Sequence, residues 1–374
     1  MKKLAIIGAS YLQLPLVKKA KELGLETLCF AWEDGAVCSS VCDKFFPIST
    51  TDEEEILRVC KIEGIDGVCT IASDVAAPTS AYVAEHLGLI GNSYESAVKA
   101  NNKYQMREAF MRSGVPCPHY KMVTCAGEID SGHLVYPLIV KPSDRSGSLG
   151  VQKVENGREL KLAIENAISL SFKKEAMVEE YIEGREISVE FISYKGKHYP
   201  LAITDKVTTG APHFVELEHH QPANLTNNQY EEIYKLTRKA LDALGITNGA
   251  SHSEYKITSD GSIYIMEVGA RMGGDFIGSN LVQLSTGYDF LKGVIDVALG
   301  VFQEPQISLC SYSGVYFLCK ETEGLKRIIE HRELYPEVSQ AEITDSTLRN
   351  IKCSGDRSGF FIYCSSSKFI PQFK

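Results

Sequence analysis

The first hundred residues alternate short apolar runs with segments of helical periodicity, and this alternation constrains the fold more than any other feature. The apolar runs lie at 4–7, 27–30 and 67–71. The helical segments lie at 12–23, 53–63 and 75–87. Because buried strands that alternate with helices form parallel sheets, we predict a small doubly wound α/β domain over residues 1–98.

The turn after the first apolar run bears on cofactor binding. Gly8 stands there, where a dinucleotide-binding loop would begin, but the sequence reads GASYLQ and lacks the second and third glycines. A tight strand-to-helix turn is therefore the favoured interpretation, and a Rossmann cofactor site is the weaker alternative.

The pattern beyond residue 98 changes to a mixed α+β order. A helix with Lys103 near its start precedes several strands, and a long helix is predicted at 227–244. The turn at Gly261 predicts a hairpin of two strands at 250–257 and 262–268. Further strands are expected at 186–194, 199–207, 214–217, 314–320 and 359–365.

Composition excludes several classes of protein. A net charge of -9 argues against a nucleic-acid partner, which needs a basic surface. No apolar run approaches the roughly 18 to 20 residues that span a bilayer, so no membrane partner is expected. The 11 cysteines include no C-x-x-C pair, so we interpret them as reduced thiols and expect a cytoplasmic protein.

A loop of small residues, from Pro142 to Gly150, follows Lys141 at the end of a predicted strand. Backbone N–H groups in such a loop can hold phosphate oxygens, and the lysine adds a positive charge. An acidic segment, 178–186, follows further on and could place backbone groups and a carboxylate beside a nucleoside. An ordinary hairpin loop and a solvated acidic turn are the alternatives for these two segments.

Glu254 and Glu267 lie near the middles of the two strands of the predicted hairpin. Pairing would bring their carboxylates together, and two such charges about 4 Å apart repel by roughly 4 kcal/mol unless a cation intervenes. Oxygen ligands beside a phosphate site favour Mg²⁺. Arg271 follows on a glycine-rich turn and could bind a carboxylate or a phosphoryl group, with an ordinary ion pair as the alternative.

The histidines do not predict a zinc site, because the chain has no H-E-x-x-H motif and no cysteine cluster. His252 alternates with Glu254 along one strand, so both side chains are expected on one face. His219 and His220 precede Pro222 in a predicted loop over the cleft, where a structural or surface role is as plausible as a catalytic one.

Taken in order, these motifs resemble those of the ATP-grasp superfamily over nearly the whole chain. They are K-P-x-D-x-x-G-S-x-G-V at 141–151, E-E-Y-I-x-G-x-E at 179–186, and the acidic pair with its downstream arginine. The resemblance implies an ATP-grasp fold with an α/β and α+β composition. Its expected parts are an N-terminal parallel α/β domain (1–98), a lid subdomain (99–182), a central subdomain with the metal site (183–300) and a small C-terminal subdomain (301–374).

The resemblance also implies roles for individual residues. The ATP phosphates would contact Lys103, Lys141, Ser143, Ser146, Gly147, Ser148 and Gly150. Adenine would contact Glu179, Glu180, Tyr181 and Ile182, and the ribose would contact Glu186. Glu254 and Glu267 would hold Mg²⁺, with Mn²⁺ as an alternative, and Arg271 and Lys141 would be catalytic.

Three stretches, 213–225, 270–289 and 356–362, resemble the carboxylate–amine ligases of the L-amino-acid (dipeptide) ligase type. This resemblance implies a carbon–nitrogen ligase that acts on a small carboxylate and an amine through an acyl-phosphate, releasing ADP and phosphate, and a homodimer. Its substrate side would include His213, Glu216, His252, Arg271 and Gly273.

Two alternatives stay open at this point. One is a carbamoyl-phosphate-synthase-like enzyme that uses bicarbonate, and the other is a nucleotide-binding protein without turnover. Many members of the superfamily read E-x-N-x-R, with the asparagine as a further metal ligand, whereas this chain has Gly269. The number of Mg²⁺ ions is therefore open.

Overall fold

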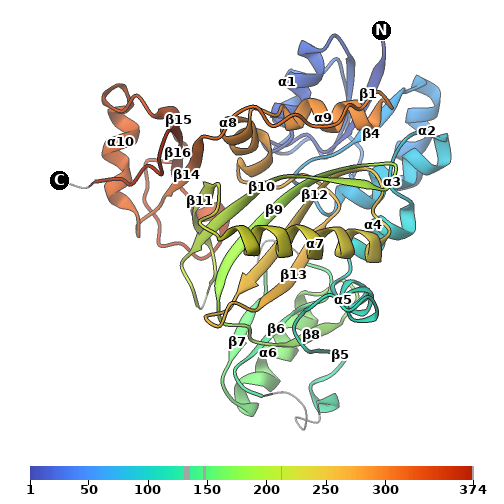
Figure 1. Ribbon diagram of the computed structural model, residues 1–374. Helices are drawn as coiled ribbons and strands as arrows, with labels where there is room; N and C mark the ends of the chain where they lie inside the picture. Colours follow the sequence, from blue (N-terminus) through green and yellow to red (C-terminus); the bar gives the residue numbers. More distant parts are fainter. Residues whose placement is uncertain (130–134, 146–148, 212, 373–374) are drawn as a thin grey trace.

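The computed structural model describes residues 1–129, 135–145, 149–211 and 213–372, and Figure 1 shows their arrangement around three sheets. The N-terminal sheet is parallel, with the order β3-β2-β1-β4. The chain builds outward from β1 to β3 and then places β4 on the other side of β1, as a doubly wound sheet requires. Its elements are β1 (Lys3–Ile7), α1 (Leu14–Glu22), β2 (Glu26–Phe30), β3 (Lys44–Phe46), α2 (Glu53–Glu63), β4 (Gly67–Cys69) and α3 (Ala76–Leu87).

Two helices lead from the N-terminal sheet to a four-stranded antiparallel sheet with the order β5-β8-β6-β7. The apolar side of α6 packs against this sheet through Leu160, Ala163, Ile164 and Ala167. The elements are α4 (Tyr94–Ala100), α5 (Lys103–Arg112), β5 (Tyr120–Val123), β6 (Leu138–Pro142), β7 (Gln152–Val154), α6 (Gly157–Leu170) and β8 (Ala176–Glu180).

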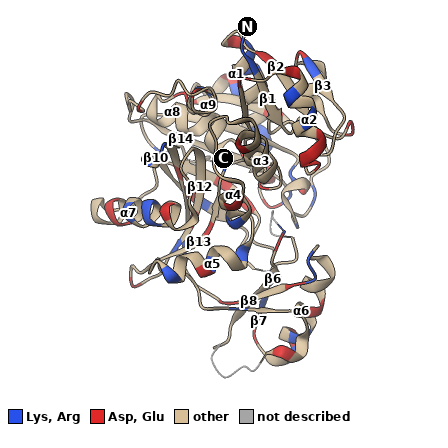
Figure 2. Cartoon of the chain, turned by 90° about the vertical axis from the view of Figure 1, so that its right-hand side faces the viewer, with Lys and Arg blue, Asp and Glu red and all other residues tan. Residues whose placement is uncertain are grey.

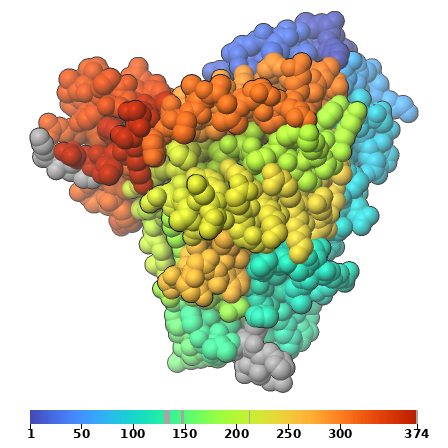
Figure 3. All heavy atoms as spheres, in the orientation of Figure 1, coloured from blue at the N-terminus to red at the C-terminus, as the bar shows by residue number. Residues whose placement is uncertain are grey.

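The largest sheet has eight strands in the order β13-β12-β9-β10-β11-β14-β16-β15. Its elements are β9 (Arg185–Tyr194), β10 (Lys197–Thr208), β11 (Glu216–Gln221), α7 (Asn227–Leu244), β12 (Gly249–Ile257), β13 (Ile263–Gly269), α8 (Val282–Thr286), α9 (Phe290–Ala298), β14 (Tyr312–Leu318), α10 (Lys326–Glu330), β15 (Val338–Ile343) and β16 (Gly359–Ser365). The C-terminal strands thus extend the central sheet, and the C-terminal segment projects from the side of the molecule (Figure 3).

Helix α7 covers one face of the central sheet and leaves the other face for the cleft. Thr226 and Gln229 form a capping box at its start, and Gly245 ends it with a left-handed φ of 75°. Its buried residues pack with apolar residues of β9, β12 and β13 in one core. Acidic and basic residues alternate on its outer surface (Figure 2). Side chains alternate along β12, so Tyr255 points toward α7 and hydrogen-bonds Thr237 there, whereas Glu254 lies on the cleft face.

The predicted hairpin and the structure agree closely. Strands β12 and β13 pair antiparallel, and Gly261, with a φ of 87°, makes the turn between them. Two strands lack the apolar alternation that would have predicted them: β3 has three half-buried residues, and β15 alternates poorly at the sheet edge. No described helix is long and apolar enough to cross a membrane.

The loop expected at His219 and His220 is wrong, although a structural role for them is among the expectations. The strand predicted at 214–217 begins at Glu216 and runs to Gln221, so both histidines lie in β11 rather than in a loop over the cleft. The physical reason is that β11 pairs with β10 on one side and with β14 on the other, which buries its polar side chains within the sheet.

Candidate active site

A cavity of about 220 Å³ lies between the four-stranded antiparallel sheet β5-β8-β6-β7 and the cleft face of the central sheet. Residues from the antiparallel sheet, the central sheet and the segment after β4 line it, and they include most of the residues that the sequence singles out. Among the lining residues are Asp74, Lys103, Lys141, Glu179, Glu180, Tyr181, Ile182, Glu186, Lys206, Glu216, His252, Glu254, Glu267, Gly269 and Arg271. The fold therefore collects one cluster of charged groups from segments that lie nearly two hundred residues apart in sequence.

Lys103 and Lys141 approach the cavity from two directions. Lys103 begins helix α5 after the Asn102 cap, and its Nζ donates to Glu267 Oε1 at 2.8 Å. Burial lowers the pKa of Lys103, but Glu267 outweighs that effect and the net shift is upward. Lys141 lies in β6, where burial lowers its pKa more than its partner Glu179 raises it. Both lysines are therefore held in place beside the cavity by carboxylates.

The glycine-rich loop is described in part. Ser146, Gly147 and Ser148 lie outside the described residues. Ser143 is buried, and its hydroxyl donates to Glu175 Oε2 at 3.2 Å. Gly150 has a φ of 76°, which favours glycine, and a Cβ there would also displace the end of the Leu170 side chain, whose Cδ1 would lie 2.8 Å away. The role of this loop in phosphate binding stays a prediction.

Glu179 has partners that the sequence reading does not anticipate. Its side chain is 1% exposed and forms ion pairs with Lys141 and with Arg107 Nε, the latter at 2.8 Å. Burial raises the pKa of Glu179, but the two cations outweigh it and the net shift is downward. The N–H groups of Glu180 and Tyr181 already donate to the carbonyls of His119 and Pro137, at 2.9 Å and 3.3 Å.

Glu254 and Glu267 are direct partners across β12 and β13, as the hairpin predicts. Their side chains are 35% and 32% exposed, so both reach the cavity. Lys206 Nζ donates to Glu254 Oε1 at 2.6 Å, and Lys103 holds Glu267. Burial opposes ionisation of Glu254, but Lys206 and His252 lower its pKa well below the usual value. The two side chains supply the oxygen ligands that Mg²⁺ prefers, and a bound cation would have to displace the lysines that now contact them.

His252 shares the cleft face with Glu254, as its alternation predicts. Its Nε2 lies 3.4 Å from Glu254 Oε1, and its Nδ1 hydrogen-bonds Glu190. Glu190 is fully buried and also accepts the N–H of Gly273 at 3.0 Å. A Cβ at residue 273 would lie 2.6 Å from Glu190 Oε1, so this close approach requires glycine. Glu190 thus positions both His252 and the turn after β13.

Arg271 binds Asp74, which lies beyond the end of β4 in the N-terminal part of the chain. The guanidinium donates from Nε to Oδ1 and from Nη2 to Oδ2, each at 2.8 Å. Burial lowers the pKa of Arg271, but Asp74 outweighs it and the net shift is upward. A bidentate pair of this kind fixes the plane of the guanidinium as well as its position.

A second charged cluster lies around Arg357, which precedes β16. Arg357 donates from Nη1 to Asp275 at 2.7 Å and from Nη2 to the carbonyl of Glu216 at 2.9 Å. Asp275 and Phe276 have positive φ angles of 48° and 66°. Such conformations are strained for residues other than glycine, and residues that adopt them cluster at functional sites. His213 is exposed and does not line the cavity, whereas Glu216 does.

His219 and His220 have partners within the protein. His220 hydrogen-bonds Glu218 at 2.8 Å and Tyr363 at 3.0 Å, and His219 lies 4.0 Å from Asp275. Burial lowers the pKa of both histidines. In the part of the chain that the structure describes, no group of three or more His, Cys, Asp or Glu side chains is placed to hold a metal ion by itself.

The sequence analysis does not identify four residues of the site as functional candidates: Asp74, Arg107, Glu190 and Lys206. Glu190 and Lys206 each interrupt an apolar strand, and a charge at such a position is a usable signal because a buried charge needs a partner. Asp74 follows a buried parallel strand at its carboxyl end, where ligand sites gather in α/β sheets. No pattern in the sequence links Arg107 to Glu179.

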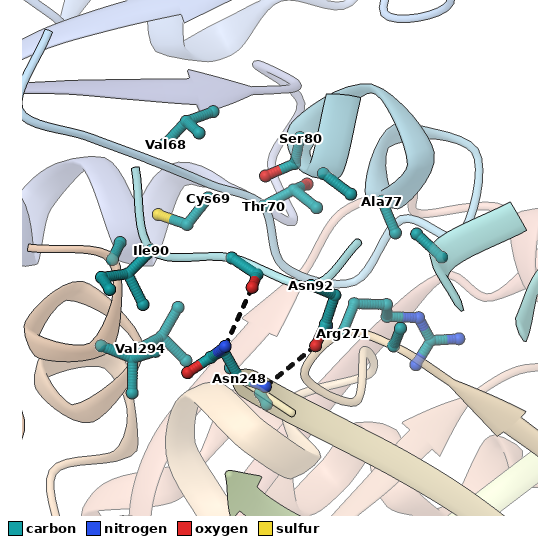
Figure 4. Close-up of a pocket in the computed structure, with 18 residues that line it drawn as sticks. Val68, Cys69, Thr70, Ala77, Ser80, Ile90, Asn92, Asn248, Arg271 and Val294 are labelled. Atoms are coloured by element: carbon teal, nitrogen blue, oxygen red, sulfur yellow. Dashed lines mark hydrogen bonds between the residues drawn. The ribbon is translucent and has the colours of Figure 1, made fainter. Parts of the chain in front are cut away.

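A smaller cavity of about 60 Å³ lies behind Arg271, between β4, α3, β12 and α9 (Figure 4). Asn248 donates from Nδ2 to the carbonyl of Gly91 at 2.9 Å, and its N–H donates to Asn92 Oδ1 at 2.9 Å. These bonds tie the end of the N-terminal domain to the start of β12. Arg271 lines both cavities and thus stands between them.

The chain is similar in sequence to a known domain family and to several known enzymes. Residues 134–279 match the ATP-grasp domain family. Alanine–anticapsin ligase of Bacillus subtilis is 28% identical over 268 residues, covering 65% of this chain and 56% of that protein. The chain thus spans a little over half the length of this curated relative. The carbamoyl phosphate synthase large chain of Clostridium beijerinckii is 25% identical over 71% of this chain and 25% of that protein.

Two solved structures have the same fold over nearly the whole of this chain. The L-amino acid ligase from Bacillus licheniformis has a TM-score of 0.79 and 26% identity, with 98% of this chain and 94% of that chain covered. Phosphoribosylglycinamide synthetase from Anaerococcus prevotii has a TM-score of 0.77 and 21% identity over the same shares, a likeness that concerns the fold alone.

Proposed function

Because this chain contains an ATP-grasp domain within an ATP-grasp fold, we propose that it is an ATP-dependent carboxylate–amine ligase. The observation that carries the proposal is the charge arrangement of the cleft. Lys103, Lys141 and Arg271 surround the same cavity as the carboxylate pair of Glu254 and Glu267. Phosphoryl transfer needs charge neutralisation and positioning more than covalent help, and these groups supply both.

The proposed reaction has two steps. An oxygen of the substrate carboxylate attacks the γ-phosphorus of ATP, the bond from that phosphorus to the β–γ bridging oxygen breaks, and ADP leaves. The amine nitrogen then attacks the acyl carbon of the acyl-phosphate, phosphate leaves with its oxygen, and the nitrogen loses a proton. The likeness to alanine–anticapsin ligase and to an L-amino acid ligase supports an amino acid as one substrate.

The residues divide these tasks. Lys103 and Lys141 would bind phosphate oxygens. Arg271 would bind the phosphoryl group and stabilise the negative charge on its oxygens during transfer. Glu254 and Glu267 would hold Mg²⁺, which when bound would neutralise the negative charge of the phosphates. Lys206 and Lys103 now pair with these two carboxylates and would have to turn toward the phosphate oxygens when the cation binds.

The substrate would lie toward Glu216 and Arg357, beyond Arg271. Glu216 lies 3.4 Å from Lys206, so this second cluster is continuous with the first.

A homodimer also remains a proposal, which the mass of the protein in solution would test.

Trapping the intermediate tests this proposal. Hydroxylamine attacks an acyl-phosphate and yields a hydroxamate, which is measured by colour with ferric ion. We expect hydroxamate when Mg²⁺-ATP, hydroxylamine and the correct amino acid are present, and none with Glu267→Gln. ADP formation that requires bicarbonate and no amino acid would instead favour the carbamoyl-phosphate-synthase-like alternative, to which the similarity to that large chain points.

A further inference from the structure

The pair formed by Arg271 and Asp74 joins two distant parts of the chain. Asp74 follows β4 of the N-terminal sheet, and Arg271 follows β13 of the central sheet. Both carboxylate oxygens are engaged, each at 2.8 Å, and the two side chains are 15% and 16% exposed. Because a buried arginine without a partner is strongly unfavourable, the N-terminal domain decides where this guanidinium lies.

The backbone supports the same contact. The N–H of Ala72 donates to the carbonyl of Met272 at 3.1 Å, beside the ion pair. Ala72 has a φ of 55°, a left-handed conformation that costs a non-glycine residue free energy. The chain thus adopts a strained turn at the point where it brings Asp74 to Arg271.

Gly269 provides the space for this pair. A Cβ at residue 269 would lie 2.8 Å from Asp74 Oδ1 and 3.1 Å from Arg271 Cζ. The φ angle of Gly269 is not positive, so its backbone conformation would accept another residue. Glycine is therefore required by the side chain of Asp74 rather than by the turn. A side chain at 269 and the observed placement of Asp74 exclude each other.

We propose that Asp74 is a positioning residue that fixes Arg271 in the cleft, and that Gly269 leaves free the space that the Asp74 carboxylate occupies. The absence of an asparagine at 269 is then explained by the room that Asp74 needs. Both oxygens of Asp74 are used by Arg271, so we assign it to positioning rather than to a metal. Arg271 Nη1, which has a long contact of 3.4 Å with the carbonyl of Met272, is the edge left for a phosphoryl oxygen.

An unfolding experiment tests the spatial part without any assay of activity. The urea midpoint is measured for the wild type, Gly269→Ala, Asp74→Ala and the double variant. We expect Gly269→Ala to lower the midpoint in the wild type and to lower it much less in the Asp74→Ala chain. Gly274→Ala is the matched control in this measurement, since its Cβ would meet Ala72 Cβ at an ordinary 3.5 Å. Equal effects of Gly269→Ala in the two chains would overturn the proposal.

The positioning part rests on the proposed function, because it needs turnover. Asp74→Asn keeps the size of the side chain and removes its charge. We expect kcat for ATP-dependent phosphate release to fall about 100-fold, the cost of a misplaced catalytic group, with KM for Mg²⁺-ATP unchanged. Asp289→Asn is the matched control: Asp289 pairs with Lys19 at 3.0 Å, also across distant segments but away from the cleft. Its kcat should equal that of the wild type.

The outcomes separate the two proposals. A wild-type chain without ATP-dependent turnover would contradict the proposed function, while the unfolding cycle would still decide whether Asp74 and Gly269 share one space. An active wild type with an equally active Asp74→Asn chain would overturn the positioning role and leave the proposed function standing. If Asp74→Asn does not fold, Gly269→Ala replaces it, with the same expected loss of kcat at unchanged KM.

Discussion

The individual residues of the cleft show how charge is buried here. Each cation faces a carboxylate: Lys103 faces Glu267, Lys206 faces Glu254, and Lys141 faces Glu179. Such pairs contribute little net stability, because desolvation offsets the attraction, but removing one partner leaves an uncompensated charge. The same pairs thus fix the positions of the charged groups in the cleft.

Glu179 permits a test of its structural role. Glu179→Gln would leave Arg107 and Lys141 buried without their counter-charge, so we expect a loss of about 3–5 kcal/mol in the free energy of unfolding, measured with urea. Glu180→Gln is the control, since Glu180 is only half-buried. Unchanged stability of Glu179→Gln combined with weaker ATP binding would instead support the adenine contact that the sequence suggests.

Arg271 permits a test of phosphoryl-group binding. Arg271→Ala removes the guanidinium whose Nη1 is left for a phosphoryl oxygen, and we expect kcat to fall by about 10²–10³. Phosphate release in steady state measures it. Arg58→Ala is the control, because Arg58 pairs with Glu55 on the exposed side of α2. Full activity of Arg271→Ala would show that another cation has this role.

The helices and strands are the level at which the sequence predicts best. Long segments with a clear period, such as α2, α7 and the β12–β13 hairpin, lie within a residue or so of their predicted bounds. The register of the hairpin also follows from its turn, which is why Glu254 and Glu267 could be paired in advance. Strands β3 and β15 are set by their neighbours in a sheet, and local composition does not reveal them; for β11 it indicates a strand but not its bounds.

Asp43 precedes β3, contacts both α1 and β2, and gives a prediction about pH. Asp43 accepts from Lys21 at 2.7 Å and from the backbone of Thr27 at 2.9 Å. Together these bonds lower the pKa of Asp43 from its ordinary value of 3.8 to about 2. A depressed pKa stabilises the fold above the unfolded-state pKa, and the contribution is lost as the pH falls from 3.8 toward 2.

We therefore expect wild type to be more stable than Asp43→Asn at pH 7, with the difference shrinking as the pH falls from about 4 toward 2. Unfolding in urea at several pH values measures it. Asp34→Asn, at a neighbouring exposed position, is the control. A difference that stays constant across this range would contradict the role of Asp43.

The whole molecule explains what the sequence leaves hidden. Asp74, Glu190, Arg271 and Arg357 come from four separate segments, and only the packing of the N-terminal sheet and the C-terminal strands against the central sheet brings them together. Motifs within one segment predict local sites such as the carboxylate pair. Contacts between segments depend on the relative placement of domains, which periodicity does not determine.

Arg357 tests whether the C-terminal segment contributes to substrate binding. Arg357→Gln would free Asp275 and Glu216, and we expect KM for the amino-acid substrate to rise about tenfold or more, with KM for Mg²⁺-ATP unchanged. Arg349→Gln is the matched control in the same segment, because its partner Asp345 is on the surface. Equal KM values for the two variants would place the substrate elsewhere.

The decisive measurement is phosphate release from Mg²⁺-ATP across a panel of amino acids and other small carboxylates, alone and in pairs, with and without bicarbonate. A ligase predicts release that requires one particular acid together with an amine, and product analysis would then find the amide. Release that depends on bicarbonate alone, or tight ATP binding with no release under any condition, would contradict a carboxylate–amine ligase.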